Sequence, residues 1–198
     1  VAGFGSNIEM IDASRYAGKQ NLATVYGFTQ KEWYLLSQKL TLIAGARIDK
    51  RTDFDLHLSP RLAMAYKHNA HWKFTASAGW GFKAPDFRHM YLNFYNAQIG
   101  YSLLGSATLG QELGKLQQQG LLQAGADISP YTNATGLKPE TSFGMHVGAK
   151  YTSGKLVAEW GLFRNNISNL IDVYALPFTR TNSLPIYSYR NVGNVFTQ

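Results

Sequence analysis

Apolar and polar residues alternate strictly along residues 72–82, WKFTASAGWGF. The even positions carry Trp72, Phe74, Trp80 and Phe82 with two alanines between them, whereas the odd positions carry only Lys, Thr, Ser and Gly. A period of two predicts a β-strand with one apolar face and one polar face. A membrane-spanning strand needs roughly 9–11 residues and has aromatic residues near both interfaces, which this segment satisfies. The segment alone fits a half-buried strand of a soluble sheet equally well.

Similar alternation predicts six further strands, at residues 22–36, 40–49, 58–67, 141–151, 156–163 and 187–196. We therefore predict an all-β fold, an antiparallel meander of about seven strands, with residues 1–20 as a loop. In the strand at 22–36, Tyr26 and Phe28 are assigned to the apolar face, which Gln30 and Glu32 interrupt.

The predicted connections differ in length in a regular way. Those at residues 37–39, 68–71 and 152–154 are short, and those near Lys50 and at 83–139 are longer. Short turns at one end of the strands and long loops at the other are typical of outer-membrane β-barrels. Within the longest loop, the spacing of Leu109, Leu113 and Leu116 predicts a short helix.

Composition narrows the class further. The 198-residue chain is 14% aromatic, contains no cysteine and has a formal net charge of +7. It has no run of eighteen apolar residues, which excludes a spanning helix, and no cysteine for a disulfide, a thiol nucleophile or a thiolate-bound metal. The Lys and Arg residues are scattered rather than clustered, so nucleic-acid binding is not favoured. The chain starts VAGFGSNIEM, without the features of a signal peptide, and we expect a fragment of a longer protein.

Several blocks of the sequence, in order, resemble the TonB-dependent outer-membrane receptors. The blocks include FTQKEWYLLSQKLTLIAGARID, LSPRLAMAY, FRNNISNLI and YRNVGNV. Two further blocks are an aromatic-Lys-Ala-Pro box that ends a strand and a Leu-Lys-Pro-Glu stretch that opens the next one: Phe82, Lys83, Ala84 and Pro85, and Leu137, Lys138, Pro139 and Glu140. The box also has a purely structural reading, because a proline cannot donate to a β-ladder and so ends a strand.

The resemblance implies part of a transmembrane β-barrel, with short periplasmic turns and long extracellular loops, in the outer membrane of a Gram-negative bacterium. It implies TonB-dependent uptake of a ferric siderophore, haem, cobalamin or a saccharide, and outer-membrane lipid, the TonB complex, a plug domain and the remaining barrel strands as partners. Nothing in the chain resembles the plug or the TonB-engaging peptide, so the later part of the barrel is expected. The alternative is a soluble β-sandwich or barrel that serves as a binding or adhesion module.

Candidate ligand residues lie in the long loop, where His89 is followed by Tyr91, Tyr95 and Tyr101. A histidine with nearby tyrosines can ligate haem iron. The same aromatic residues can equally pack the loop onto itself.

The charged residues of the predicted strands occupy the polar positions of the alternating pattern. We predict that they face the lumen, where they would line the transport path or contact the plug: Arg47, Arg61, Lys73, His146, Lys150 and Glu159. Ser77 and His146 face the same side of adjacent strands, but no acid or oxyanion donor accompanies them. The histidines lack zinc-site spacing. We therefore expect neither an enzyme nor a resident metal or cofactor.

Overall fold

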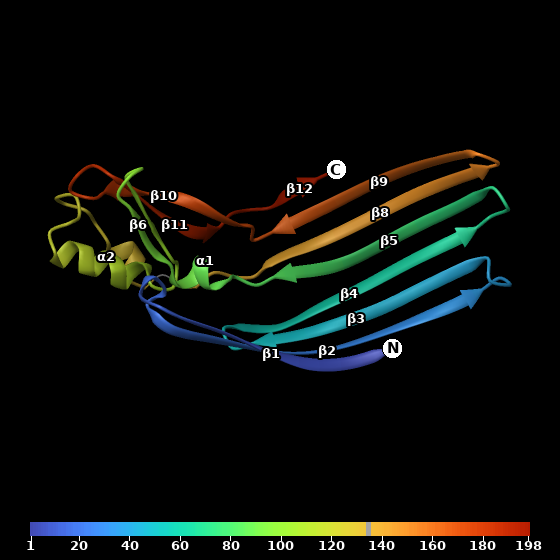
Figure 1. The fold of residues 1–198 in the computed structure, drawn as a ribbon, viewed down its shortest axis with the longest axis horizontal. Coiled ribbons are helices and arrows are strands. Elements are labelled where there is room, and N and C mark those ends of the chain that lie inside the picture. Colours follow the sequence, from blue (N-terminus) through green and yellow to red (C-terminus); the bar gives the residue numbers. More distant parts are fainter. Residues whose placement is uncertain (134–135) are drawn as a thin grey trace.

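The computed structural model describes residues 1–133 and 136–198. It is elongated, with a large sheet at one end and a smaller sheet with helices at the other (Figure 1). The large sheet has eight strands. In spatial order, they are β1 (Ala2–Ala13), β2 (Gly18–Leu35), β3 (Leu40–Arg51), β4 (Phe54–Lys67), β5 (Trp72–Lys83), β8 (Glu140–Ser153), β9 (Leu156–Ser168) and β12 (Val195–Thr197).

The smaller sheet is built from two excursions out of the large one, after β5 and after β9. Its order is β10 (Ile171–Thr179), β11 (Pro185–Asn191), β7 (Tyr101–Leu104) and β6 (Asn93–Asn96). The pairing of β11 with β7 is parallel and the other two pairings are antiparallel. The helical elements are a 3-10 turn η1 (Ser14–Tyr16), α1 (Phe87–Tyr91), α2 (Leu109–Gln118) and α3 (Ser129–Thr132). None of the helices in the described residues is long and apolar enough to cross a membrane.

The predicted antiparallel meander is confirmed, because neighbouring strands of the large sheet pair antiparallel in chain order. The predicted sorting of connections is observed in part, because the connection near Lys50, predicted to be longer, is a tight turn of only Thr52 and Asp53 between β3 and β4. The turns β2–β3, β4–β5 and β8–β9 lie together at one end, and both long excursions leave from the other end (Figure 1). The helix predicted from the spacing of Leu109, Leu113 and Leu116 is α2.

Three strand predictions need correction. Residues 1–20 are not a loop, since β1 pairs with β2 from Ala2 opposite Thr29 to Ala13 opposite Gly18. The large sheet therefore has eight strands rather than seven, and the 83–139 loop contains α1, β6, β7, α2 and α3. The predicted strand at 187–196 is two strands, β11 and β12, because the chain passes from one sheet to the other between them.

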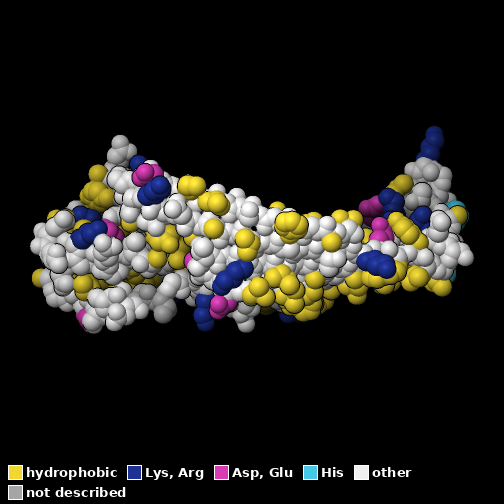
Figure 2. Space-filling view, turned by 90° about the horizontal axis from the view of Figure 1, so that it is seen from below, with side chains coloured by type: hydrophobic (Ala, Val, Ile, Leu, Met, Phe, Trp, Pro, Cys, Tyr) yellow, Lys and Arg dark blue, Asp and Glu magenta, His cyan; other side chains and the backbone are white. Residues whose placement is uncertain are grey.

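The cross-strand register separates the two faces of the large sheet. Residues directly opposite each other share a face, so Trp80 lies with Phe143 and Ala78 lies with Met145. Many large side chains of this apolar face are exposed, among them Leu62, Met64, Phe74, Trp80, Val147 and Leu162. Figure 2 shows such side chains gathered in a band along the sheet.

The face assigned to Tyr26 and Phe28 was wrong. The register pairs Phe28 with Arg47 and Tyr26 with Asp49, on the polar face. Both rings lie over glycines of β1: a Cβ atom added at Gly3 would come within 2.8 Å of the Phe28 ring. The physical reason is that aromatic side chains on the polar face fill the space that glycines leave on the neighbouring strand. The apolar face of β2 is instead formed by the odd-numbered residues, among them Val25, Trp33 and Leu35, and Thr29 and Lys31 interrupt it.

The main apolar core lies in the smaller sheet and its helices. It joins segments that are far apart in the chain: Leu104, Leu109, Leu113, Leu122, Leu176, Phe178 and Ile186. The apolar face of the large sheet, by contrast, is left uncovered by the described residues. A water-soluble sheet would bury that face against a second layer.

Candidate functional site

The two blocks that carried the resemblance meet in space, although 51 residues lie between them. Lys83 is the cross-strand partner of Glu140, and its Nζ atom lies 3.3 Å from the Glu140 carboxylate. Glu140 is buried and also accepts a hydrogen bond of 2.8 Å from the backbone of Ile171, at the start of the second excursion. Glu140 therefore contacts residues at the start of both excursions, Lys83 and Ile171, and we call this place the junction.

The rest of the two blocks has structural contacts at the same junction. The ring of Phe82 packs 4.3 Å from that of His57, and the buried Pro85 offers its carbonyl oxygen to Arg51. Lys138 exchanges two hydrogen bonds with Asn191, of 2.8 and 2.9 Å. Ala84, Leu137 and Pro139 are half-buried around them. These contacts agree with the structural reading of the box.

His89 is buried at this junction, with only 5% of its surface exposed. The backbone N–H of His89 donates to the Asp86 carboxylate at 2.9 Å, and the His89 Nδ1 atom accepts from the backbone N–H of Asp86 at 3.3 Å. This capping box begins α1. The ring meets the Tyr189 ring edge to face, with centroids 4.9 Å apart.

Burial lowers the pKa of His89 below its ordinary value. The Asp86 carboxylate, 2.8 Å from the same Nδ1 atom, acts in the opposite direction. To accept from the Asp86 N–H, the Nδ1 atom must carry no proton, which is in line with the lowered pKa. Its contacts favour the packing role over the iron-ligand role, and ligation of iron by His89 stays a prediction.

Among the described residues, the aromatic contact of His89 is with Tyr189, and the three candidate tyrosines have no aromatic contact with it. Tyr91 is half-buried, and burial raises the pKa of its phenol. Tyr95 and Tyr101 fall on opposite faces of the β6–β7 ribbon, because Tyr95 pairs with Ser102 and Tyr101 with Asn96. Arg180 stacks on the Tyr95 ring at 4.6 Å.

Sequence reasoning missed an aromatic strip that includes Tyr101. The strip crosses β6, β7 and β11 and consists of Phe94, Tyr101 and Tyr187, with centroids 6.0 and 6.1 Å apart along it. All three rings are half-buried and thus partly open to solvent. The parallel pairing of β7 with β11 creates the strip, which no local pattern could reveal. The only sequence signal was the aromatic alternation of Tyr187 and Tyr189.

The charged residues predicted to share a face do so. The register places all of them on the face opposite Trp80 and Phe82: Arg47, Arg61, Lys73, His146, Lys150 and Glu159. Arg47 binds Asp49 through two nitrogens at 2.6 and 2.8 Å, Arg61 donates to Gln30, and Lys150 pairs with Glu159. Ser77 is directly opposite His146, but no hydrogen bond joins them within residues 1–133 and 136–198. That part of the chain also holds no cluster of three metal-ligating side chains.

Solved structures show where this fold occurs. The siderophore receptor PirA from Pseudomonas aeruginosa matches with a TM-score of 0.73 at 20% identity, over 98% of this chain and 34% of that one. The hemophore receptor HasR of Serratia marcescens, solved with its hemophore HasA and heme, matches with a TM-score of 0.64 at 14% identity, over 98% and 35%. The P. aeruginosa ferric enterobactin receptor PfeA gives 0.62 at 19%, over 90% and 24%. At these identities, the matches establish the fold.

Sequence comparison agrees. An iron-regulated outer membrane virulence protein of Vibrio cholerae serotype O1 is 24% identical over 152 residues, which is 76% of this chain and 19% of the relative. The chain thus spans about a fifth of the length of the curated relatives it matches. These relatives are named as receptors and outer-membrane proteins, in agreement with the expectation that the chain is not an enzyme. The family model described as "TonB dependent receptor-like, beta-barrel" matches residues 3–198, so the chain belongs to this family of β-barrels in the Gram-negative outer membrane.

Proposed function

We propose that this chain is part of a receptor that imports an iron-bearing small molecule, a ferric siderophore or haem, across the outer membrane with energy relayed by TonB. The names of its relatives, which include siderophore, enterobactin and hemophore receptors and an iron-regulated protein, support this class over cobalamin and saccharides. In this proposal the remaining barrel strands pair with the free edges of β1 and β12, and a plug domain occupies the lumen.

One observation carries the proposal: a sheet with an uncovered apolar face ends, on one side only, in the smaller sheet and its helices, which we call the outer subdomain. A lipid-facing wall explains the exposed apolar side chains, and an outer ligand-capturing region explains the subdomain. The runner-up, a soluble binding or adhesion module, would require a second layer over that face, and the described residues supply none.

The opposite face is proposed to line the lumen. A charged side chain on the lipid side costs roughly 2–4 kcal/mol near the bilayer midplane, whereas a charge facing water or a plug costs little. Lys67, Lys73 and Lys150 lie in one cross-strand row of this face. Within this row, only Lys150 forms an ion pair with an acidic residue, Glu159. This row is the most cationic part of the wall and is suited to acidic side chains of the plug.

For ligand contact, the aromatic strip is favoured over His89. Phe94, Tyr101 and Tyr187 offer partly exposed rings for stacking and two hydroxyl groups for hydrogen bonds, whereas the His89 ring is buried and already paired. Among the four residues predicted from the sequence, His89, Tyr91, Tyr95 and Tyr101, the best candidate for ligand contact is therefore Tyr101.

The test uses the full-length receptor that contains this chain. Fluorescence quenching is titrated with ferric enterobactin and with haem for the wild type and for the Tyr101→Ala, Tyr187→Ala and His89→Ala variants, and iron uptake is measured with and without TonB. We expect binding of one of these probes to weaken about tenfold in each tyrosine variant, a loss of ~1.4 kcal/mol. Uptake independent of TonB, or no binding of either probe, would contradict the proposal.

A further inference from the structure

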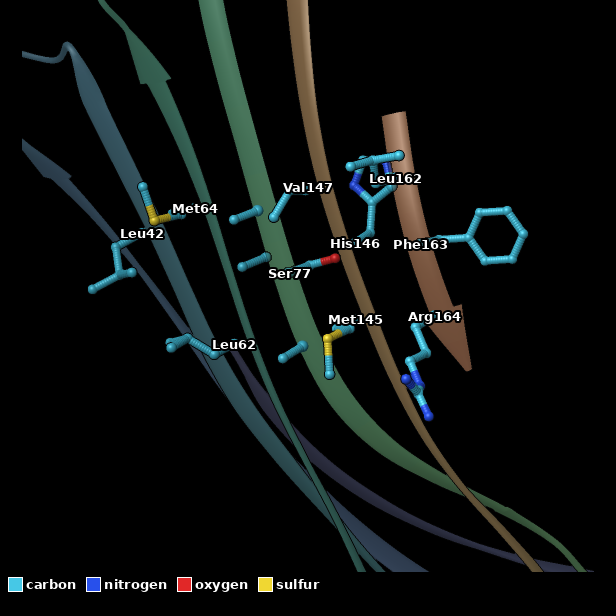
Figure 3. Close-up of a pocket in the computed structure, with 13 residues that line it drawn as sticks. Leu42, Leu62, Met64, Ser77, Met145, His146, Val147, Leu162, Phe163 and Arg164 are labelled. Atoms are coloured by element: carbon cyan, nitrogen blue, oxygen red, sulfur yellow. The ribbon is translucent and has the colours of Figure 1, made fainter. Parts of the chain in front are cut away.

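A shallow hollow of about 340 Å³ lies on the apolar face of the large sheet, over the middle of β5 (Figure 3). Nine of its lining residues lie on the same face of the sheet as Trp80: Leu42, Leu62, Met64, Ala76, Ala78, Met145, Val147, Leu162 and Arg164. We call these nine residues the groove. The floor is formed where β5 carries only Ala76 and Ala78, and larger side chains of β4 and β8 stand on either side of it.

The groove is apolar except for one residue. Arg164 lies directly opposite Met145, and the two are adjacent in Figure 3. Its side chain is exposed, its Nε donates to Asn166 at 3.1 Å, and its guanidinium lies 5.2 Å from the Phe196 ring. Within the described ranges, no carboxylate comes within ion-pair distance of it. A cation on the lipid side of a barrel is tolerated near an interface rather than at mid-depth.

The register shows which interface this is. One cross-strand row runs Lys31, Ala44, Leu62, Ala78, Met145, Arg164. Lys31 is four residues from the short-turn end of β2, at Leu35, whereas Arg164 is eight residues from the short-turn end of β9, at Leu156. The strands of a barrel are tilted, so residues directly opposite one another lie progressively farther from the short-turn end of the sheet from β2 to β9. Arg164 therefore marks the end of the groove nearer the outer leaflet.

We propose that the groove binds one acyl chain of a membrane lipid whose phosphate head group pairs with Arg164. The apolar walls suit a hydrocarbon chain, and the two flexible methionines can adapt to its shape. Lipid tails compete equally for any apolar surface, so a specific site needs a second interaction. The planar guanidinium supplies it, since arginine binds phosphate oxygens in a bidentate, charge-assisted manner. This inference rests on the membrane-facing orientation of the apolar face and is independent of the ligand that the receptor imports.

Native mass spectrometry of the full-length receptor in detergent tests the site, with dipalmitoyl phosphatidylglycerol as the probe. Dipalmitoyl phosphatidylcholine serves as the comparison lipid, with the same chains and no net charge. We expect Arg164→Gln to weaken phosphatidylglycerol binding about tenfold, as for loss of a charged hydrogen bond, and Ala78→Leu to weaken binding of both lipids by filling the floor. Inorganic phosphate alone should not displace the bound lipid.

Two matched controls lie on the same face outside the groove. Lys31→Gln removes the cation at the other end of the same row, and Ala46→Leu enlarges an alanine of β3; neither should change lipid occupancy. Equal effects of Arg164→Gln and Lys31→Gln, equal effects of Ala78→Leu and Ala46→Leu, or a second receptor copy in place of lipid would overturn the proposal. Iron uptake, measured in parallel, distinguishes loss of the lipid site from failure of the receptor.

Discussion

The Nη2 atom of Arg51 lies 2.6 Å from the carbonyl oxygen of Pro85, so a buried hydrogen bond joins residues 34 positions apart. The same guanidinium binds both oxygens of Asp53, at 2.6 and 2.7 Å, and stacks 5.1 Å from the Phe54 ring. Arg51 is only 6% exposed. The hairpin between β3 and β4 thus fixes the point at which the chain leaves β5 for the outer subdomain.

Replacement of Arg51 by methionine should free the chain at the point where it leaves β5. Asp53 and the Pro85 carbonyl would lose their partner in a buried setting, at a cost of about 3 kcal/mol in unfolding free energy. Arg51→Lys should recover only part of the loss, because an ammonium group cannot serve both partners in the geometry of the guanidinium fork. Urea unfolding of the receptor in detergent and protease cleavage within residues 86–133 measure the effect. Lys50→Met, an exposed neighbour, should change little; if it matches Arg51→Met, the anchor is not specific.

The contact between Gly105 and α1 leaves no room for a side chain. A Cβ atom at Gly105 would lie 2.5 Å from backbone atoms of Met90 and Tyr91, where nothing can yield without moving the helix. Gly105→Ala should therefore destabilise the outer subdomain by about 1–3 kcal/mol. Gly114→Ala is the matched control, because its Cβ would meet nothing within 4 Å inside α2 and should add about 0.5–1 kcal/mol of stability. Equal shifts in melting temperature for the two variants would contradict the packing described.

Burial of His89 makes the outer subdomain sensitive to acid. Because the pKa of His89 is lowered in the folded protein, the unfolded chain takes up its proton at a higher pH. The stability is therefore complete above the unfolded pKa of ~6.5 and falls as the pH drops through it. The nearby charges act in both directions: Asp86 and Glu140 favour the proton, and Arg88 and Lys83 oppose it.

The measurement is the melting temperature at mildly alkaline and mildly acidic pH, compared between wild type and His89→Gln. Glutamine can still accept the Asp86 N–H but does not titrate. We expect the wild type to lose more stability on acidification than the variant, whereas equal losses would show that His89 does not cause the effect.

A lysine scan of β5 probes both faces with adjacent residues. Ala76 lies between Met64 and Val147, and Thr75 lies between Ala65 and Gly148 on the opposite face. Ala76→Lys should cost roughly 2–4 kcal/mol and reduce the amount of folded receptor in the membrane, whereas Thr75→Lys should be tolerated. Heat-modifiable migration in gel electrophoresis measures the folded fraction.

The sequence predicted what depends on local alternation and missed what depends on distant pairing. The period of two located β5, β8 and both of their faces. It missed β1, where Phe4, Ile8 and Met10 of the apolar face are mixed with glycine and polar residues. It also misassigned Phe28, because an aromatic residue fits a lipid-facing wall and a space above a glycine equally well.

The candidate site was the least predictable part. The Lys83–Glu140 junction and the Tyr101–Tyr187 contact join segments 57 and 86 positions apart, and the second depends on a parallel strand pair formed by two separate excursions. The capping contact of His89 with Asp86 is local, but its burial under Tyr189 is not. A residue type typical of iron ligation therefore turned out to occupy a packed, hydrogen-bonded position.

The most direct test of the central claim, that one face of this sheet meets lipid and the other the lumen, is spin labelling along β5. This chain contains no cysteine, so single cysteines at Thr75, Ala76, Ser77 and Ala78 can be labelled in the membrane-embedded receptor once any cysteine elsewhere in it is replaced. Collision rates with oxygen, which concentrates in the bilayer, should be high at residues 76 and 78 and low at 75 and 77. Similar rates at all four positions, or the reverse alternation, would contradict the account.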